Sequence, residues 1–291
     1  MHRKLPVAVL SLVAFSWPVS AFADTLSERI SQAFNAMVPE TWADQDIKLA
    51  IGAGMVAVPD YDGSNNYKVQ PLPILEFRWG RFSFQGNEIR YVLADAPVRV
   101  GIVSRLDLGR SEGSNRALHG MGKIGTSLET GGFAQAMWKN WVGQVELRQD
   151  ILSGHKGLVG VLAGGRKETL TSRLGIIYGV GLTWGDGNYG QAKFGVTDEQ
   201  AAASGYPQYH PGSGFTSAEL RFIVNYDLTE RLKLNAGIGY RRILGDAADA
   251  PFIKGPGSPN QMIAGLTFHY TLWRKRGTAD AGAASTQPEG F

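Results

Sequence analysis

Apolar and polar residues alternate along most of this chain, and this period of two constrains its fold more than any other feature. The clearest case is FTSAELRFIVNYDL, residues 215–228. Its apolar positions are Ala218, Leu220, Phe222, Val224, Tyr226 and Leu228. Its polar positions are Ser217, Glu219, Arg221, Asn225 and Asp227, with Ile223 as the exception. Because alternate residues of a strand lie on opposite faces, the segment predicts a strand with one apolar and one charged face.

The same alternation recurs from residue 46 to residue 273. We predict twelve strands, over residues 46–58, 69–79, 81–93, 98–109, 120–130, 132–139, 141–151, 157–167, 169–184, 215–228, 231–244 and 261–273. The boundaries between residues 81 and 140 are the least defined, so ten strands is the alternative count.

Two architectures accommodate many strands of this kind. A soluble β-sandwich buries the apolar faces between two sheets, whereas a transmembrane barrel turns them toward lipid. Segments such as 215–228 exceed the ~5–6 residues of most soluble strands. Aromatic residues also lie near strand ends, as in the interfacial girdles of membrane barrels: Trp79, Trp141, Trp184, Tyr226 and Trp273. These features favour the barrel.

The lengths of the connections support the same choice. Very short turns at 80 and 229–230 contrast with long connections at 59–68, 185–214 and 245–260. Outer-membrane barrels show this asymmetry between their two ends, although the connection at 110–119 breaks it. Lipid leaves the backbone groups of an open sheet edge unpaired. We therefore expect a closed antiparallel transmembrane β-barrel over residues 46–273.

The two ends of the chain differ from this pattern. Residues 1–23 have the basic start, apolar stretch and small-x-small site of a secretory signal peptide. Residues 24–45 form a predicted N-terminal periplasmic segment with a short amphipathic helix over 25–38. That helix is either a frayed leader or a plug for the lumen or membrane surface. Residues 274–291 have the composition of a flexible tail.

Composition excludes several classes of function. The net charge of +3 falls to +1 once Arg3 and Lys4 leave with the signal peptide, so the basic balance indicates no nucleic-acid partner. The chain has no cysteine, which excludes disulfides and thiol chemistry. The histidines His119, His155 and His210 fall in predicted loops without a metal partner at ligand spacing, and we read them as exposed. We expect no catalytic set, metal or cofactor.

The long connection 185–214 contains its own helix signal. Thr197 and Gln200 have the spacing of a capping box, Ala201–Ala203 favour a helix, and Gly205 ends it. The helix has either a structural role over the barrel mouth or a role in binding. For binding, the candidate loop interaction surface is Tyr61, Tyr189, Phe194, Tyr206, Tyr209 and His210.

The inward faces of the predicted strands carry charge of both signs. We predict a lumen charge network of Arg78, Arg99, Arg105, Glu146, Arg173, Glu219, Arg221 and Arg241. Paired charges suit a closed, rigid interior, and unpaired ones a water-filled channel. Wide channels need 16 or more strands, so twelve favour a narrow or blocked lumen.

Several motifs resemble one known family. The first hairpin carries Gly52-x-Gly54, Pro59-x-Tyr61-x-Gly63-Ser64 and Pro71-x-Pro73. Phe194-Gly195-Val196-Thr197 and the segment Leu244–Pro251 continue the match. The pattern resembles the MltA-interacting protein (MipA/OmpV) family of outer-membrane proteins over roughly residues 46–273.

The resemblance implies a place in the cell outer membrane, in contact with its lipid. It also implies a scaffold role that joins a lytic murein transglycosylase to a murein synthase during peptidoglycan turnover. The alternatives are a narrow small-solute channel and a surface adhesin or antigen. The resemblance supplies no catalytic residues, so we expect a protein that is not an enzyme.

Overall fold

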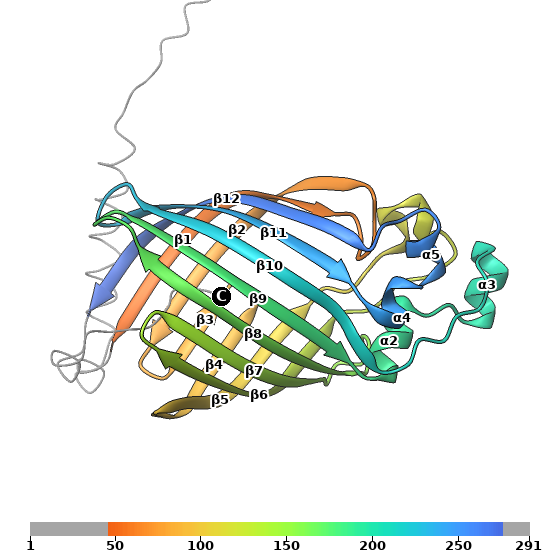
Figure 1. The fold of residues 1–291 in the computed structure, drawn as a ribbon, viewed down its shortest axis with the longest axis horizontal. Helices are drawn as coiled ribbons and strands as arrows, with labels where there is room; N and C mark the ends of the chain where they lie inside the picture. Colours follow the sequence, from red (N-terminus) through yellow and green to blue (C-terminus); the bar gives the residue numbers. More distant parts are fainter. Residues whose placement is uncertain (1–45, 276–291) are drawn as a thin grey trace, which may run out of the picture. The chain divides into compact units, whose positions relative to one another are not determined.

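The computed structural model describes residues 46–275, which form one closed antiparallel barrel of twelve strands (Figure 1). The strands are β1 (Ile47–Pro59), β2 (Tyr67–Trp79), β3 (Phe82–Gln85), β4 (Glu88–Ala96), β5 (Val98–Asp107), β6 (Ser127–Trp138), β7 (Trp141–Asp150), β8 (Leu158–Thr169), β9 (Leu174–Gly185), β10 (Gly214–Asp227), β11 (Leu232–Ile243) and β12 (Asn260–Lys275). Each strand pairs with its neighbours in sequence, and β12 pairs with β1 to close the ring. The predicted fold class is confirmed.

The limits of the barrel differ slightly from those predicted. Its last strand continues to Lys275, two residues beyond the predicted end, and takes these residues from the expected tail. The predicted signal peptide, the helix at 25–38 and the rest of the tail lie outside the described residues.

The strands alternate in exposure as their sequence alternates in polarity. On β7, Val145 and Leu147 are 50% and 53% exposed, whereas Glu146 and Arg148 are 1% and 2% exposed. Leu220 on β10 and Ile238 on β11 also point outward and are each 56% exposed. The apolar faces therefore form the outer surface of the barrel, and the charged faces line its interior.

The single strand predicted over 81–93 is wrong. It is a short hairpin, β3 and β4, that turns at Gly86 and Asn87. Gly86 has a φ of +60°, a conformation that glycine adopts without steric cost. A two-residue Gly-Asn connection is itself a hairpin signal, and the alternation on both sides of it concealed the turn.

The two strands predicted over 120–130 and 132–139 are also wrong, because they are the single strand β6. Gly131 and Gly132 suggest a turn but lie inside the strand. A Cβ atom at Gly131 would lie 1.9 Å from the carbonyl oxygen of Leu147 on β7, so this glycine serves close backbone approach. The two errors cancel, which is why the count of twelve holds.

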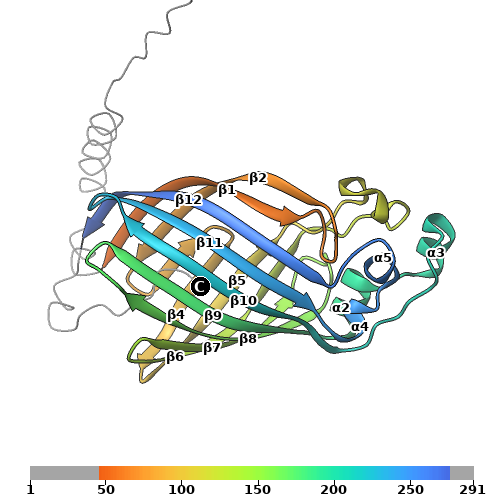
Figure 2. The ribbon, with the colours of Figure 1, turned by 45° about the horizontal axis from the view of Figure 1, so that its top comes forward.

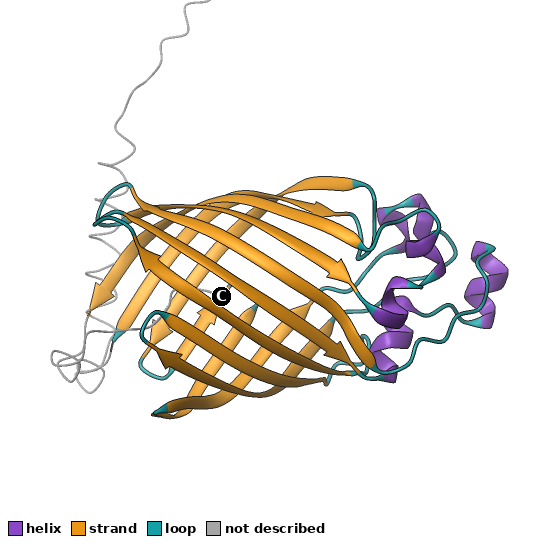
Figure 3. Ribbon diagram, in the orientation of Figure 1, coloured by secondary structure: helices purple, strands orange, loops and turns teal. Residues whose placement is uncertain are grey.

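The corrected order also removes the anomalous loop. The connection 108–126 between β5 and β6 lies at the same end as the other long loops, which we call the loop end (Figures 1 and 2). All helices of residues 46–275 gather there (Figure 3): η2 (Glu112–Ser114), η3 (Arg116–Leu118), α2 (Gly187–Phe194), α3 (Asp198–Ser204), α4 (Gly245–Ala248) and α5 (Pro251–Lys254). Within this described part of the chain, none has both the length and the apolar character needed to span a bilayer. We call the opposite end, with its short connections, the turn end.

The predicted helix in the long loop is confirmed as α3. Thr197 Oγ1 accepts from Gln200 N at 3.3 Å, and Gln200 Oε1 accepts from Thr197 N at 2.9 Å, which completes the capping box. Gly205 ends the helix with a φ of +79°. The sequence reasoning missed α2, which begins after Asp186, a residue whose carboxylate accepts from Tyr189 N at 2.8 Å.

The main apolar core lies in the loops rather than inside the barrel. Residues from four connections and the last residue of β11 pack into one cluster, which we call the cap core: Tyr61, Leu118, Met121, Phe194, Val196, Ile243, Ala247, Ala250, Phe252 and Ile253. Phe252 and Ile253 are fully buried. The loops therefore form an ordered cap over the loop end of the barrel.

Candidate functional site in the barrel lumen

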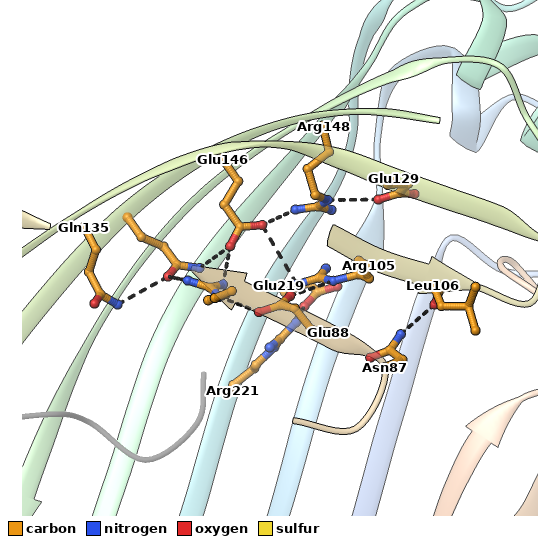
Figure 4. Close-up of polar contacts among 12 residues, drawn as sticks. Asn87, Glu88, Arg105, Leu106, Glu129, Gln135, Glu146, Arg148, Glu219 and Arg221 are labelled. Carbon is orange, nitrogen blue, oxygen red and sulfur yellow. Dashed lines mark hydrogen bonds and ion pairs between the residues drawn. The ribbon is translucent and has the colours of Figure 1, made fainter. Parts of the chain in front are cut away.

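A network of ion pairs lies inside the barrel between β4 and β7 (Figure 4). At its centre, the buried Glu146 on β7 accepts from Arg90 on β4 and from Arg148 on β7. Arg148 Nε also donates to Glu129 on β6 at 2.9 Å. Since β4 and β7 are separated by β5 and β6 in the ring, the Arg90–Glu146 pair bridges non-adjacent strands.

Glu88 extends this network to β5. Its carboxylate accepts from Arg90 Nε at 2.5 Å and from Arg105 Nε at 2.9 Å. Arg105 also lies 3.9 Å from Glu146. Charged groups removed from water are stable only when paired in good geometry, and here Glu88 faces two arginines and Glu146 three.

A second group of charges lies on β10 and β11. Glu219 accepts from Arg221 Nε at 3.0 Å and from Arg241 Nε at 2.5 Å. Arg241 Nη1 reaches Asp62 in the first loop at 3.0 Å, so this group ties the cap to the wall.

Three further arginines from the predicted network lie elsewhere. Arg78 is 3.9 Å from Glu76, which also pairs with Lys48 at 3.0 Å. Arg99 pairs with Asp95 at 2.7 Å near the turn end. Arg173 lies in the exposed turn before β9, because that strand begins only at Leu174. The structure thus brings together two charge groups where the sequence suggested one.

His155 was expected to be exposed, and this is wrong, since only 2% of it is accessible. The Asp150 carboxylate accepts from the backbone N–H groups of Leu152, His155 and Lys156 and folds the loop back over the lumen. His155 Nε2 then lies 3.1 Å from Glu129 Oε1. The tight turn of backbone donors around Asp150 has no simple sequence signal.

The surroundings of His155 bear on two kinds of chemistry. Its Nδ1 accepts from Gly157 N at 3.0 Å while Nε2 faces Glu129, so neither ring nitrogen is available to Ser127. Ser127 Oγ instead accepts from the backbone N of His155 at 3.2 Å. This arrangement lacks the nucleophile–base hydrogen bond of a hydrolase.

The same place gathers three groups of the types that bind metals. Ligand atoms of Asp107, Glu129 and His155 lie within 4.8 Å of one another. However, Lys193 Nζ is 2.5 Å from Asp107 Oδ2, and Arg148 holds Glu129. Both carboxylates are therefore already paired with cationic side chains, which a metal ion would have to displace.

A cavity of about 460 Å³ lies beside the charge networks. Its lining includes charged residues such as Arg105, Arg148 and Arg221. It also includes small or apolar residues of β8 and β9, which lie between β7 and β10 in the ring: Val159, Val161, Ala163, Gly179 and Gly181. The lumen thus keeps an amphipathic space under the cap.

The predicted loop interaction surface lies largely within the cap. Tyr61 is 6% exposed and donates to Phe252 O at 3.0 Å, while Tyr206 donates to Ala117 O at 3.1 Å. Burial raises the pKa of the Tyr61 hydroxyl to about 12, with Tyr206 adding to the shift. Phe194 is also buried.

Three other members of that surface lie nearby. Tyr189 packs against the rings of His155 and Phe194, and burial raises its pKa. Tyr209 donates to Asp246 O at 2.7 Å, and the exposed His210 meets Gln191 Oε1 at 3.1 Å. A partner-binding role for these residues stays a prediction.

These features define a class of protein. An even-numbered antiparallel barrel with an apolar outside, a polar inside, short turns at one end and long loops at the other is a transmembrane barrel of the outer-membrane type. The family profile described as MltA-interacting protein MipA matches residues 51–272. The chain therefore belongs to the MipA family and is an outer-membrane protein.

Relatives of known name support the same family. The MltA-interacting proteins of Escherichia coli (strain K12) and Shigella flexneri are each 23% identical to this chain over 218 residues. Each match covers 72% of this chain and 85% of the relative.

Several solved barrels are more distantly similar. A NanC porin structure is 13% identical and covers 76% of this chain and 98% of its own, with a TM-score of 0.41. The COG4313 outer membrane channel from Pseudomonas putida F1 is 10% identical and covers 80% and 99%, with a TM-score of 0.43. These values are too low to transfer a channel activity to this chain.

Proposed function

We propose that this protein is a non-enzymatic outer-membrane scaffold that binds murein-remodelling enzymes through its turn end. The relatives are named for an interaction with MltA, and the family resemblance implies a lytic murein transglycosylase and a murein synthase as partners. Short turns of outer-membrane barrels face the periplasm, where murein lies. The turn end is therefore the surface that such enzymes reach.

The observation that carries this proposal is the use of the lumen charges. Arg90, Glu146 and Arg148 bind one another in the interior, and the cap core covers the loop end. Paired charges of this kind brace the wall and leave few groups to attract a passing ion. A rigid, braced barrel suits a protein that presents a surface.

The turn end offers charge for such a surface. Arg81, Lys139 and Arg173 are exposed in or beside three of its short connections. Lys139 lies 4.7 Å from the centre of the Trp138 ring, and Trp138 is 67% exposed. Basic and aromatic groups together suit an acidic partner surface, because charge complementarity steers association.

The test compares two variants with the same change in charge. The first carries Arg81→Glu, Lys139→Glu and Arg173→Glu at the turn end. The second carries Arg116→Glu, Lys123→Glu and Lys254→Glu at the loop end, where all three residues are exposed. Full-length protein in lipid nanodiscs is titrated with a purified lytic murein transglycosylase and, separately, with a murein synthase.

The scaffold proposal expects wild type and the loop-end variant to bind alike, and the turn-end variant to bind at least about tenfold more weakly. Equal binding by both variants would place the contact elsewhere on the protein. A wild-type protein that binds neither enzyme at micromolar concentration would contradict the scaffold role itself.

A narrow small-solute channel is the second candidate. The 460 Å³ cavity favours it, as does Arg221, whose side chain is 53% exposed within that space. Solutes would have to pass the cap core at one end and the Arg90–Glu146 pair inside, which is why we rank this function second.

A further inference from the structure

The barrel wall is interrupted over part of its height between β2 and β5. The β3–β4 hairpin is short, so β2 pairs with β3 only over Glu76–Trp79. On that side of β2, no strand of residues 46–275 pairs with Tyr67–Leu75. The hairpin tip ends beside Leu75 and Leu106, as Gly86 N donates to Leu75 O at 3.2 Å and Leu106 N to Asn87 O at 2.9 Å. Above this tip, toward the loop end, the wall is interrupted.

The sequence of β2 fits an edge that stays unpaired by another strand. The carbonyl of Leu75 points toward the hairpin, and alternate residues of a strand direct their backbone groups to the same neighbour. Pro71 and Pro73 therefore lie at the positions whose N–H groups would face the interruption. Proline has no N–H, and it protects edge strands from pairing with another strand.

The inward positions of the unpaired stretch change from polar to apolar toward the hairpin tip. Lys68 and Gln70 come first, and Leu72 and Ile74, in phase with Glu76, follow them; Leu72 is 38% exposed. On the outer side, Val69 is 63% exposed. An apolar surface that passes from the outer face to the inner face of the wall suits an alkyl chain rather than water.

The lumen cavity reaches this place. Its lining includes Asn87 at the hairpin tip and Leu106 and Leu108 on the facing strand end (Figure 4 shows the first two). Leu108 is 77% exposed. The same lining holds the small and apolar residues of β8 and β9, with the charged Glu129 and Arg148 of β6 and β7 between these strands and β5 in the ring. The interruption thus opens onto the cavity.

The cavity lining offers one accessible cation to a negative group. Its other cations are held by carboxylates on several sides: Arg105 by Glu88, Arg148 by Glu129 and Glu146, Lys193 by Asp107, and Arg241 by Asp62 and Glu219. Arg221 is bound only on its Glu219 side, and half of its side chain is accessible. A carboxylate can pair with such a guanidinium in bidentate fashion.

We propose that the interruption between β2 and β5 is a lateral opening through which a long-chain fatty acid enters the lumen from the bilayer. The alkyl chain passes Leu72, Leu106 and Leu108. The carboxylate lies beside Arg221. A strand of a partner protein is the poorer occupant of this edge, because Pro71 and Pro73 offer it no N–H donors.

The chain has no cysteine, so a fluorophore attached to one introduced cysteine reports on that position alone. Full-length variants Leu72→Cys and Ile223→Cys are labelled with a bimane fluorophore in phosphatidylcholine vesicles that carry doxyl-labelled phosphatidylcholine. Both residues occupy inward positions, but Ile223 lies on β10, whose two neighbours pair along its length. The proposal expects the label at 72 to be quenched at least threefold more strongly than the label at 223. Equal quenching overturns the lateral opening.

A second arm tests the ligand. The label at Ala163→Cys, inside the cavity, is titrated with doxyl-labelled palmitate, and Leu147→Cys on the outer face of β7 is the control for lipid contact. We expect saturable quenching at 163 by palmitate but not by doxyl-phosphatidylcholine, and quenching at 147 by both. Arg221→Gln should raise the half-saturating palmitate concentration at least fivefold. Absent quenching at 163, equal quenching by both lipids, or an unchanged value in Arg221→Gln overturns the fatty-acid assignment.

Discussion

Arg90 on β4 donates a hydrogen bond to Glu146 on β7 inside the barrel, across two intervening strands. Glu146 is one of the least accessible residues of the described chain, at 1% exposure. The same carboxylate binds Arg148, and through it Glu129. These central charges therefore have a structural use, and they must be paired because Glu129, Glu146 and Arg148 are shielded from water.

Removal of this central carboxylate should be costly. Glu146→Gln leaves Arg90 and Arg148 without their shared counter-charge, and we expect a loss of about 3–5 kcal/mol in the free energy of unfolding. Arg221→Gln is the control, because its exposed ion pair should contribute less than about 1 kcal/mol. Urea unfolding in lipid vesicles measures both, and equal losses would show that Glu146 is not the centre of the network.

Two glycines with the same backbone φ angle allow the cost of backbone strain to be compared with the cost of a steric clash. Gly120 and Gly205 both have a φ of +79°. A Cβ atom at Gly120 would lie 2.6 Å from the backbone carbon of Ala203 in α3, whereas at Gly205 nothing lies within 4 Å. Gly205→Ala should therefore cost about 1 kcal/mol through strain alone, and Gly120→Ala clearly more. The rate of hydrogen exchange in α3 compares the two variants. Equal rates would show that the backbone around Gly120 and α3 moves apart at little cost.

The cap should loosen separately from the barrel. Phe252→Ala removes a fully buried ring from the cap core, a change that typically costs about 3–5 kcal/mol. Because few cap residues contribute to the strand ladder, we expect faster proteolysis and hydrogen exchange in loops 108–126, 186–213 and 244–259, with unchanged barrel strands. His210→Ala, at an exposed position, should change neither. Loss of strand protection in Phe252→Ala would contradict a separable cap.

Alkaline pH should act on the cap through Tyr61. Burial raises the pKa of its hydroxyl from 10.0 to about 12, so the protonated form is favoured in the folded cap. This contribution to stability is complete below pH 10 and is lost as the pH rises toward 12. We expect cap proteolysis to accelerate above pH 10. Tyr61→Phe, which cannot ionise, should start slightly less stable but show a flatter pH profile, and identical profiles would exclude Tyr61 as the cause.

The sequence predicted the barrel because its period of two extends over most of the chain and depends only on which face meets lipid. Local signals also succeeded where they were self-contained, as in the Thr197–Gln200 capping box of α3. The two wrong strand assignments both depend on glycine. Gly86 lies in a turn, whereas Gly131 lies inside an uninterrupted strand. The difference is set by the backbone of a neighbouring strand, whose position the sequence does not reveal.

The site was predicted less completely than the fold. Alternation predicts that Glu146, Glu219 and Arg241 face inward, but it cannot say which charges meet, because that depends on the curvature and register of the ring. Two features carried no local signal at all. His155 is buried by backbone donors around Asp150, and the interruption beside Pro71 and Pro73 arises from the length of a hairpin on another strand.

The lumen ion pairs and the cap core together should keep the barrel closed to ions, so that the protein acts through its surfaces. Planar bilayer recording of the wild-type full-length protein measures whether it is closed. We expect no steady conductance, with current steps appearing only when Glu146→Gln and Phe252→Ala are combined. Reproducible, steady ion-conducting steps from the wild-type protein would contradict it.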